Sequence, residues 1–345
     1  MDRTEICDVA RRTIDNVLGA ENSSYTNTFK VELEADRLLF IPLVPTPLVV
    51  DEELNKKLYN ALAFALYPYF TVLAPDGVDI VATRNTNYST RRALAFTLRK
   101  GRLYFADYPK QQPGNFRVPV MENYKINFEL ETSIGVSGAS GTGKSTFVNY
   151  LIECLSTAGA DMHVIDPKSD ELSKLAKSKG LKCFKAADYT NSNDFVNAVN
   201  DLLKKYIDLI HKRQKNYLES GKRDPKRYYI VIDELIALIA SANKTASDTL
   251  KQQLETIAVI GRSSNVSLIL IAQDWNVASS GISTTLRNQI SVKVALGRPS
   301  KSSLQYLFPD IDSIIVPAGP GTGVISSNSA MDGRAYPILA PTVEK

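Results

Sequence analysis

Residues 134–146 read IGVSGASGTGKST, and this stretch decides the fold of the larger part of the chain. A short apolar strand leads into small residues, then into a lysine and two hydroxyls that open a segment with the apolar spacing of a helix. Residues 138–145 fit the pattern GxxxxGK followed by Ser or Thr. The glycines let successive backbone N–H groups face one centre, and the helix N-terminus adds partial positive charge. The stretch therefore predicts a phosphate-binding loop between a strand and a helix.

The loop residues are expected to surround the phosphates of a nucleotide. Lys144 would reach the β and γ phosphates, the Ser145 hydroxyl would ligate Mg²⁺, and Thr146 would line the α-phosphate side. The chain has no NKxD-like motif after an apolar strand, which disfavours a guanine nucleotide. The sequence therefore predicts ATP and Mg²⁺ as cofactors. The predicted nucleotide-binding residues are Gly138, Ala139, Ser140, Gly141, Thr142, Gly143, Lys144, Ser145 and Thr146.

A second buried strand supplies the acids that such a loop needs. Residues 228–234 read YYIVIDE, an apolar run that ends in two carboxylates. Burying these acids would be costly unless they emerge at the carboxyl end of the strand, facing an ion or solvent. Asp233 is therefore predicted to hold the Mg²⁺, and Glu234 to orient or deprotonate the attacking water. The alternative is that both acids only cap the following helix, LIALIASA.

A glutamine ends a further apolar strand, VSLILIAQ at 266–273. A polar amide at the tip of a strand beside the nucleotide is predicted to sense the γ-phosphate. Gln273 therefore joins Lys144 and Glu234 as a catalytic candidate, and a solvated loop position is the alternative.

The composition is that of an ordinary globular protein. The 345 residues are 44% hydrophobic, and 41 Lys and Arg against 37 Asp and Glu give a net charge of +4, too small to indicate a nucleic-acid binder by itself. Three cysteines without a CxxC pair predict neither a disulfide framework nor a zinc site. The N-terminus lacks the apolar core of a signal peptide, and no run of about 18 apolar residues occurs. We therefore expect a cytoplasmic protein without stable membrane insertion.

Apolar spacing divides the chain into two expected domains. Residues 1–112 combine two helical patterns with alternating, strand-like stretches, which predicts a small α+β domain. The proline-punctuated PKQQPGNFRVPV at 109–120 is interpreted as a linker or an approach to the next domain. Residues 113–345 alternate apolar strands with helices, which predicts an α/β fold with a mostly parallel sheet covered on both faces.

Four segments carry a resemblance to a known family. They are GASGTGKST, VIDPKSDEL at 164–172, IVIDELIAL at 230–238 and IGRSSNVSLILIAQ at 260–273. In order and spacing they resemble the FtsK/SpoIIIE family of DNA-translocating ATPases, over about residues 117–340. The resemblance implies a RecA-like motor that works as a homo-oligomeric, hexameric ring, with ATP at subunit interfaces and DNA through the centre.

A ring motor needs a cation from the neighbouring subunit to neutralise charge on the γ-phosphate. Where the family's arginine finger would fall, this chain has Lys293, a point charge without the bidentate fork. Arg262, Arg287 and Arg298 are the nearby candidates for the same role. For each of them an ordinary surface salt bridge is the alternative.

Contact with DNA is expected to be electrostatic, because a motor that moves over any sequence must hold phosphates. The resemblance places Lys301 and Arg334 in loops toward the pore, and Gln305 stands where the family usually has another basic residue. A basic run from His211 to Arg227 is a second candidate for nucleic-acid contact. A solvated helix end is the alternative interpretation of that run.

Two absences shape the expected biology. The sequence shows neither a membrane-spanning region nor the winged-helix module of chromosome-segregating members, which suggests a mobile element, plasmid or phage. We expect an ATP-dependent DNA translocase, with a relaxase, replication or secretion partner. The alternatives are a viral genome-packaging ATPase, an EssC-like protein-secretion ATPase, and an assembly protein that binds ATP as a switch. Glu234 disfavours the last, since a pure switch has little use for a catalytic acid.

Overall fold

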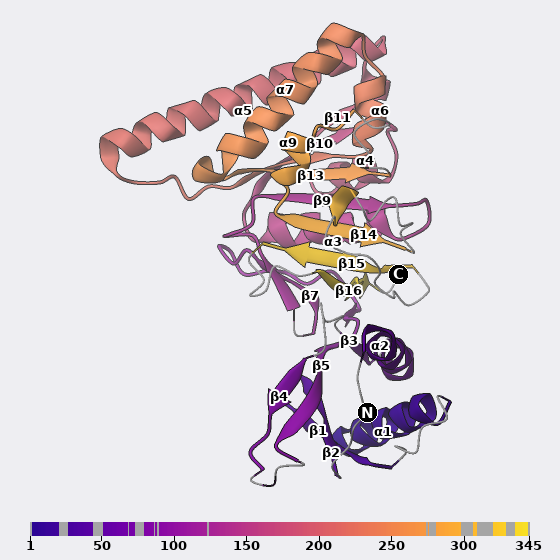
Figure 1. Ribbon diagram of the computed structural model, residues 1–345. Coiled ribbons are helices and arrows are strands. Elements are labelled where there is room, and N and C mark those ends of the chain that lie inside the picture. Colours follow the sequence, from indigo (N-terminus) through magenta and orange to yellow (C-terminus); the bar gives the residue numbers. More distant parts are fainter. Residues whose placement is uncertain are drawn as a thin grey trace.

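The computed structural model describes residues 2–20, 27–43, 51–67, 69–72, 79–85, 87, 90–122, 124–273, 275, 281–297, 306–308, 320–328 and 335–343. Within these residues the chain forms a five-stranded and an eight-stranded sheet, with two short strand pairs beside them. The two larger sheets lie at opposite ends of the molecule, with the N-terminal one at the bottom of Figure 1.

The small sheet is antiparallel, in the order β1-β2-β5-β3 with β4 also paired to β5. Two helices pack on one face of it, where alternate apolar residues such as Leu38, Phe40 and Phe96 form a buried core with Ile14 and Leu62 of the helices. Its elements are α1 (Arg3–Ala20), β1 (Phe29–Glu34), β2 (Arg37–Pro42), α2 (Glu52–Leu66), β3 (Phe70–Val72), β4 (Ile80–Ala82) and β5 (Arg92–Lys100).

The large sheet has the order β11-β10-β12-β13-β9-β14-β15-β16. The first six strands of this order are parallel; β15 runs in the opposite direction, so its pairings with β14 and with β16 are antiparallel. The predicted α/β fold with a mostly parallel sheet is confirmed. Its strands are β9 (Ser133–Gly138), β10 (Asp161–Asp166), β11 (Lys182–Lys185), β12 (Tyr228–Ile232), β13 (Val266–Ala272), β14 (Val292–Leu296), β15 (Thr322–Ser327) and β16 (Ala335–Leu339).

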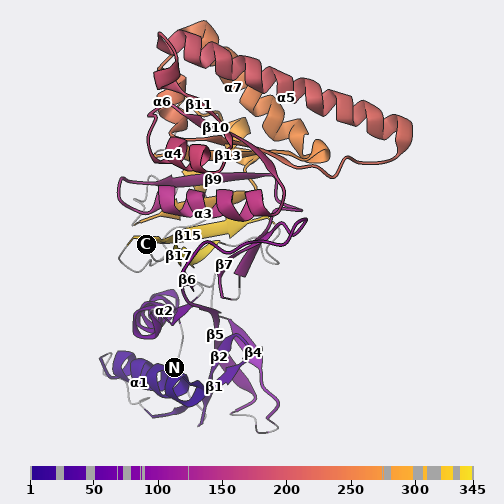
Figure 2. The ribbon, with the colours of Figure 1, turned by 180° about the vertical axis from the view of Figure 1, so that it is seen from behind.

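Helices cover both faces of this sheet. One face packs against α3, α4 and the hairpin of β7 and β8, and the other against α5, α6, α7 and α9. Figure 2 shows α3 and α4 in front of the strands, with the long α5 at the far edge. Because both faces are covered, a strand such as β13 is apolar and buried along its whole length. The helices are α3 (Lys144–Thr157), α4 (Glu171–Ser178), α5 (Ser192–Ser220), α6 (Leu235–Ala240), α7 (Lys244–Ile260) and α9 (Thr284–Asn288), with short 3₁₀ turns at Ala186–Asp188 and Gly261–Ser264.

Two segments near the junction of the two parts differ from expectation. The predicted linker contains β7 (Arg117–Met121), which pairs with β8 (Tyr124–Asn127); its proline is tolerated in a two-stranded hairpin. β6 (Tyr104–Phe105) lies within the first 112 residues, but it pairs with β17 (Thr342–Val343) from the second part of the chain and not with β5. Where the domains divide, at 112/113 in the sequence interpretation, remains a prediction. Among the described residues, no helix is both long and apolar enough to cross a membrane.

Candidate nucleotide site

The strand order places the predicted site residues along one edge of the large sheet. Parallel strands end on the same side, so the carboxyl ends of β10, β12, β13 and β9 lie in a row. The residues that follow these four strands are Lys168, the pair Asp233 and Glu234, Gln273, and the phosphate loop. The fold therefore brings together groups that are far apart in the sequence.

The phosphate loop has the conformation that its glycines require. Gly143 is the N-cap of α3 with φ 95°, and no side chain caps the helix, so its first N–H groups face the loop. A Cβ atom at Gly138 would lie 2.6 Å from the carbonyl oxygen of Leu296 and from the hydroxyl of Thr142, which only glycine avoids. The Lys144 ammonium donates to the carbonyl oxygens of Gly138 (2.6 Å) and Ala139 (2.8 Å). The lysine thus folds over the loop that is predicted to hold phosphates.

A turn far along the chain forms one wall of the loop. The Gly321 N–H donates to the carbonyl oxygen of Thr142 at 2.9 Å, and a Cβ atom at Gly143 would lie 3.0 Å from the Gly321 nitrogen. Arg102 in turn donates to the carbonyl oxygen of Pro320 at 2.9 Å. The sequence around Gly321 gives no sign of this contact with the phosphate loop.

The acids lower the cost of placing Lys144 here. Burial lowers the pKa of Lys144, Lys168 adds to this effect, and the negative charges of Glu234 and Asp233 oppose it. An ammonium on the phosphate loop, within the influence of two acids, is the arrangement expected for a cation that meets a polyphosphate.

Glu234 is held by its surroundings and does not cap a helix. Its backbone is left-handed, φ 49° and ψ 64°, which is unusual for a residue with a side chain. Although it occupies the N-cap of α6, its side chain makes no capping hydrogen bond. Its Oε2 instead accepts hydrogen bonds from Lys168 Nζ at 3.0 Å and Gln273 Nε2 at 3.1 Å. The alternative that Glu234 only caps the helix therefore does not account for its side chain. Gln273 is exposed, yet it contacts this acid.

Asp233 is a carboxylate whose charged form is disfavoured by its surroundings. Burial raises its pKa to about 6, the neighbouring Asp166 and Glu234 act in the same direction, and Lys168 acts against them. A cation beside it would relieve this cost, and Ser145 at the start of α3 offers the hydroxyl that commonly shares a nucleotide-bound Mg²⁺. No cluster of three or more His, Cys, Asp or Glu side chains suited to a metal ion occurs among the described residues.

The sequence interpretation assigned no role to Asp166 or Lys168. Asp166 is fully buried and accepts five hydrogen bonds: from the backbone N–H groups of Lys168, Ser169, Asp170 and Ser173, and from the Ser173 hydroxyl. These bonds fix the loop that carries Lys168 to Glu234. The available signal was the same as for Asp233, an acid at the end of an apolar strand.

The candidates for a cationic finger have different surroundings. Arg262 lies in the 3₁₀ turn before β13, so it is at the amino edge of the sheet, opposite the phosphate loop. There it lines a hollow of about 330 Å³ with Leu130 and Val259, which are more than half exposed. Arg287 is turned inward, donating to Trp275 O, Tyr306 O and Thr284 Oγ1.

The remaining basic candidates divide into two groups. Lys293 lies within β14, paired with Gly135 of β9. Arg298, Lys301, Gln305 and Arg334 lie outside the described residues.

Three basic side chains of the run at 211–227 have structural contacts. Arg213 is buried and pairs with Asp224 at 2.6 Å, and Lys226 pairs with Asp161 at 2.6 Å. Arg227 donates to the carbonyl oxygen of Phe128. These three side chains support the amino edge of the sheet, which favours the interpretation of the run as a helix end over a nucleic-acid patch.

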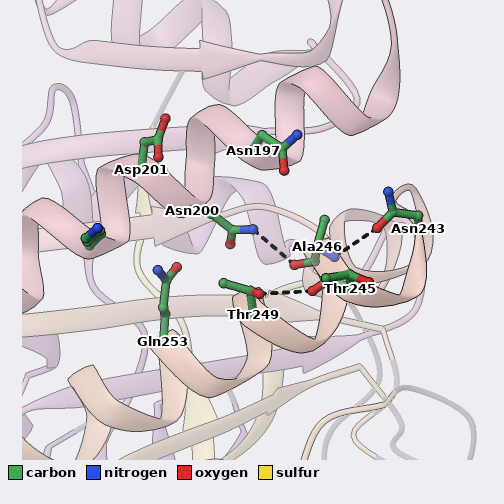
Figure 3. A pocket seen from close by; sticks show the side chains of 9 residues that line it. Asn197, Asn200, Asp201, Asn243, Thr245, Ala246, Thr249 and Gln253 are labelled. Atoms are coloured by element: carbon green, nitrogen blue, oxygen red, sulfur yellow. Dashed lines mark hydrogen bonds between the residues drawn. The ribbon is translucent and has the colours of Figure 1, made fainter.

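A polar hollow of about 380 Å³ lies away from the phosphate loop, between α5 and α7. Figure 3 shows Asn197, Asn200 and Asp201 of α5 facing Thr249 and Gln253 of α7 across it. Asn200 donates to the carbonyl oxygen of Ala246 at 3.0 Å and so joins the two helices. The hollow holds none of the predicted site residues, so it is not the nucleotide site.

No known family profile matches the chain. In sequence, 252 residues are 23% identical to the Ftsk domain-containing protein YdcQ of Bacillus subtilis strain 168, covering 69% of this chain and 49% of YdcQ. The chain thus spans about half the length of that relative.

Two solved structures share the fold. The pCW3 conjugation coupling protein TcpA, in monomer form with ATPgS, superposes with a TM-score of 0.57 and 18% identity over 97% of this chain and 95% of TcpA. ATPases 2 and 3 of EssC from Geobacillus thermodenitrificans give 0.53 and 17% identity over 71% of this chain and 48% of that one. These findings support the resemblance stated from the motifs: the chain is similar in sequence to an FtsK-domain protein and shares its fold with TcpA and with the EssC ATPases.

Proposed function

We propose that this chain is an ATP-dependent DNA translocase. It would work as a ring, a hexamer in the family that its motifs resemble, and move DNA in the transfer or replication of a mobile element, plasmid or phage. A cytoplasmic location and a relaxase, replication or secretion partner belong to the same proposal.

The observation that carries the proposal is the extent of the likeness to TcpA. It covers 97% of this chain and 95% of that coupling protein, so both the small sheet and the large sheet are included. The likeness to EssC covers 71% of this chain. A protein-secretion motor is therefore the second candidate, because the chain matches 95% of the TcpA structure but only 48% of that EssC structure.

Within the site, each residue has a proposed role. Residues 138–146 would cradle the phosphates, with Lys144 on the β and γ phosphates. Ser145 and Asp233 would hold Mg²⁺, which supplies charge neutralisation when bound. Glu234 would accept a proton from the attacking water or orient it, because its carboxylate is held beside the loop and bonded to Gln273.

Arg262 is the finger candidate that the geometry favours. It sits at the amino edge of the sheet, away from the phosphate loop of its own chain, beside the half-exposed apolar side chains of Leu130 and Val259. A surface of this kind suits contact with a neighbouring subunit, whose nucleotide the arginine would reach. Arg287 makes internal contacts instead. Arg298 and Lys293 remain candidates, and Lys301 and Arg334 remain the proposed contacts to DNA.

The test is ATP hydrolysis with and without DNA. Phosphate release should rise when single-stranded or double-stranded DNA is added, and the protein should displace a triplex-forming oligonucleotide from a duplex only with ATP. Lys144→Ala should lower turnover about 100-fold or more, because a cation on the transferred phosphate is lost. Heparin serves as the polyanion control. Turnover that is indifferent to DNA, or equally stimulated by heparin, would refute translocation.

A further inference from the structure

We propose that Lys168 is a positioning residue for Glu234: it binds one carboxylate oxygen, together with Gln273, and leaves the other oxygen as the acceptor for the attacking water's proton. This inference rests on ATP hydrolysis at the proposed site, and it does not depend on DNA. It deepens the role of Glu234 by naming the residue that orients it.

The first step is the division of labour between the two oxygens of Glu234. Both Lys168 Nζ and Gln273 Nε2 bind Oε2, at 3.0 and 3.1 Å. Two donors on one oxygen fix the carboxylate plane and reduce the basicity of that oxygen. Among the described residues no hydrogen bond to Oε1 is found, so Oε1 is the oxygen that remains to accept a proton.

The second step is that Lys168 is the cation available for this task. The site holds three acids, Asp166, Asp233 and Glu234, and two lysines. The ammonium of Lys144 lies on the carbonyl oxygens of the phosphate loop. Lys168 makes the ion pair with Glu234, whose side chain is only 10% exposed. An acid this buried gains more from a fixed cation than an exposed pair would.

The third step is that the backbone of Lys168 is fixed in advance. Buried Asp166 accepts the N–H groups of Lys168 and Ser169 with one oxygen and those of Asp170 and Ser173 with the other. Ser169 has a left-handed backbone, φ 57°, in the same loop. A loop held at both carboxylate oxygens presents its lysine with little loss of freedom on pairing. Asp166 thus acts at one remove, by fixing the loop that carries the lysine.

The position of Lys168 at the end of β10 gives it this reach. β10 lies next to β12 in the sheet, although α4, β11 and the long α5 separate them in the sequence. Lys174, on the following helix, is 81% exposed and pairs with Asp170 four residues before it. It is the matched control, a lysine from the same segment that does not contact Glu234.

The experiment measures basal ATP hydrolysis of Lys168→Ala, Lys168→Arg and Lys174→Ala, each alone and in a Glu234→Gln background. Lys168→Ala should lower kcat about tenfold to 100-fold with KM and the affinity for ATP over ADP unchanged, because a misplaced base costs rate and not binding. Lys168→Arg should recover part of the loss, and Lys174→Ala should change nothing. In Glu234→Gln, adding Lys168→Ala should have no further effect, since the lysine acts through the acid.

Two results would overturn the proposal. A loss of ATP affinity relative to ADP would make Lys168 a phosphate ligand. An equal loss of kcat in the wild-type and Glu234→Gln backgrounds would make Lys168 a structural residue. In that case Lys168→Ala should lower the unfolding temperature equally in both backgrounds. Failure of the translocase proposal has a different signature, normal basal hydrolysis that DNA does not stimulate, and it leaves this test intact.

Discussion

The two edges of the large sheet use their charges in opposite ways. At the amino edge, Arg213 pairs with Asp224 and Lys226 with Asp161, both at 2.6 Å. At the carboxyl edge, Lys144 and Lys168 lie near three acids. One of them, the proposed base Glu234, has a left-handed backbone. The charges at the amino edge therefore form ion pairs that stabilise the structure. The carboxyl edge holds more acids than lysines, and its acids are in unfavourable surroundings or backbone conformations. Strain of this kind is characteristic of functional sites, and it costs stability.

The largest effect that would sharpen this contrast is expected at Glu234. Glu234→Gln should lower the turnover of ATP about 100-fold to 10,000-fold while ATP still binds, because a base is replaced by an amide of the same shape. Phosphate release and binding of a fluorescent ATP analogue measure the two quantities. If hydrolysis persisted at the wild-type rate, the carboxyl edge would lack its proposed base and the contrast would fail.

The next effect is expected at the amino edge, on stability and not on activity. Arg213→Ala should reduce the free energy of unfolding by about 3 kcal/mol, because the buried guanidinium also donates to the carbonyl oxygens of Lys226 and Ser264. Urea unfolding measures the loss, and ATP hydrolysis at 20 °C should stay close to wild type. Exposed Lys212 is the control, and Lys212→Ala should leave unfolding unchanged.

The pH dependence of the Arg213 variant follows from its partner. The N–H of Lys226 and the Arg213 guanidinium hold the pKa of Asp224 below its usual value. A carboxyl whose pKa falls on folding stabilises the protein above its unfolded pKa, and this contribution is lost as the pH falls through the lower, folded value. The difference between Arg213→Ala and wild type should therefore persist at pH 7 and narrow below about pH 4. A difference that grew in acid would contradict the assigned pair.

The smallest effect is expected at Asp233, where a substitution should stabilise the fold and not destabilise it. Because the pKa of Asp233 is raised to about 6 in the fold, the folded protein loses stability as the pH rises from the unfolded pKa through 6. Asp233→Asn should therefore raise the free energy of unfolding by about 1 to 3 kcal/mol at pH 8 without divalent metal. Hydrolysis should be lost in the same variant.

The control for Asp233→Asn is a second pH. Thermal unfolding at pH 8 and at pH 4 separates the effect, since the carboxyl is protonated in the fold at pH 4 and the gain should shrink. If Asp233→Asn lowered the unfolding temperature at pH 8, the charged Asp233 carboxylate would not destabilise the fold. The contrast between the two edges would then be lost.

Local patterns predicted much of this edge. The phosphate loop, the strand that precedes it and the helix that follows it lie where the glycines and the apolar spacing placed them. Asp233 and Glu234 follow β12 as expected, because an apolar run that ends in acids has few other arrangements. These features depend on residues next to one another in the sequence, so a single sequence contains the information.

Contacts between distant segments were not predictable in the same way. Lys168 meets Glu234 only because β10 and β12 are neighbours, and Gly321 meets Thr142 only because the turn before β15 folds back onto the loop. The inward turn of Arg287 depends on Trp275 and Tyr306 in the same way. Spacing and residue type carry no record of which strands become neighbours, so these roles required the structure.

The central place of β9 also sets an order of events during synthesis. This strand emerges early, but both of its neighbours, β13 and β14, are encoded later, the nearer one roughly 130 residues downstream. At typical ribosome speeds the nascent strand waits about 6 to 26 s with both edges unpaired. In the part of the chain that the structure describes, the strands of the small N-terminal sheet pair only with one another, so this sheet can be complete before then. The phosphate loop is thus translated early, but it reaches its folded conformation only after β13 and β14 have been made.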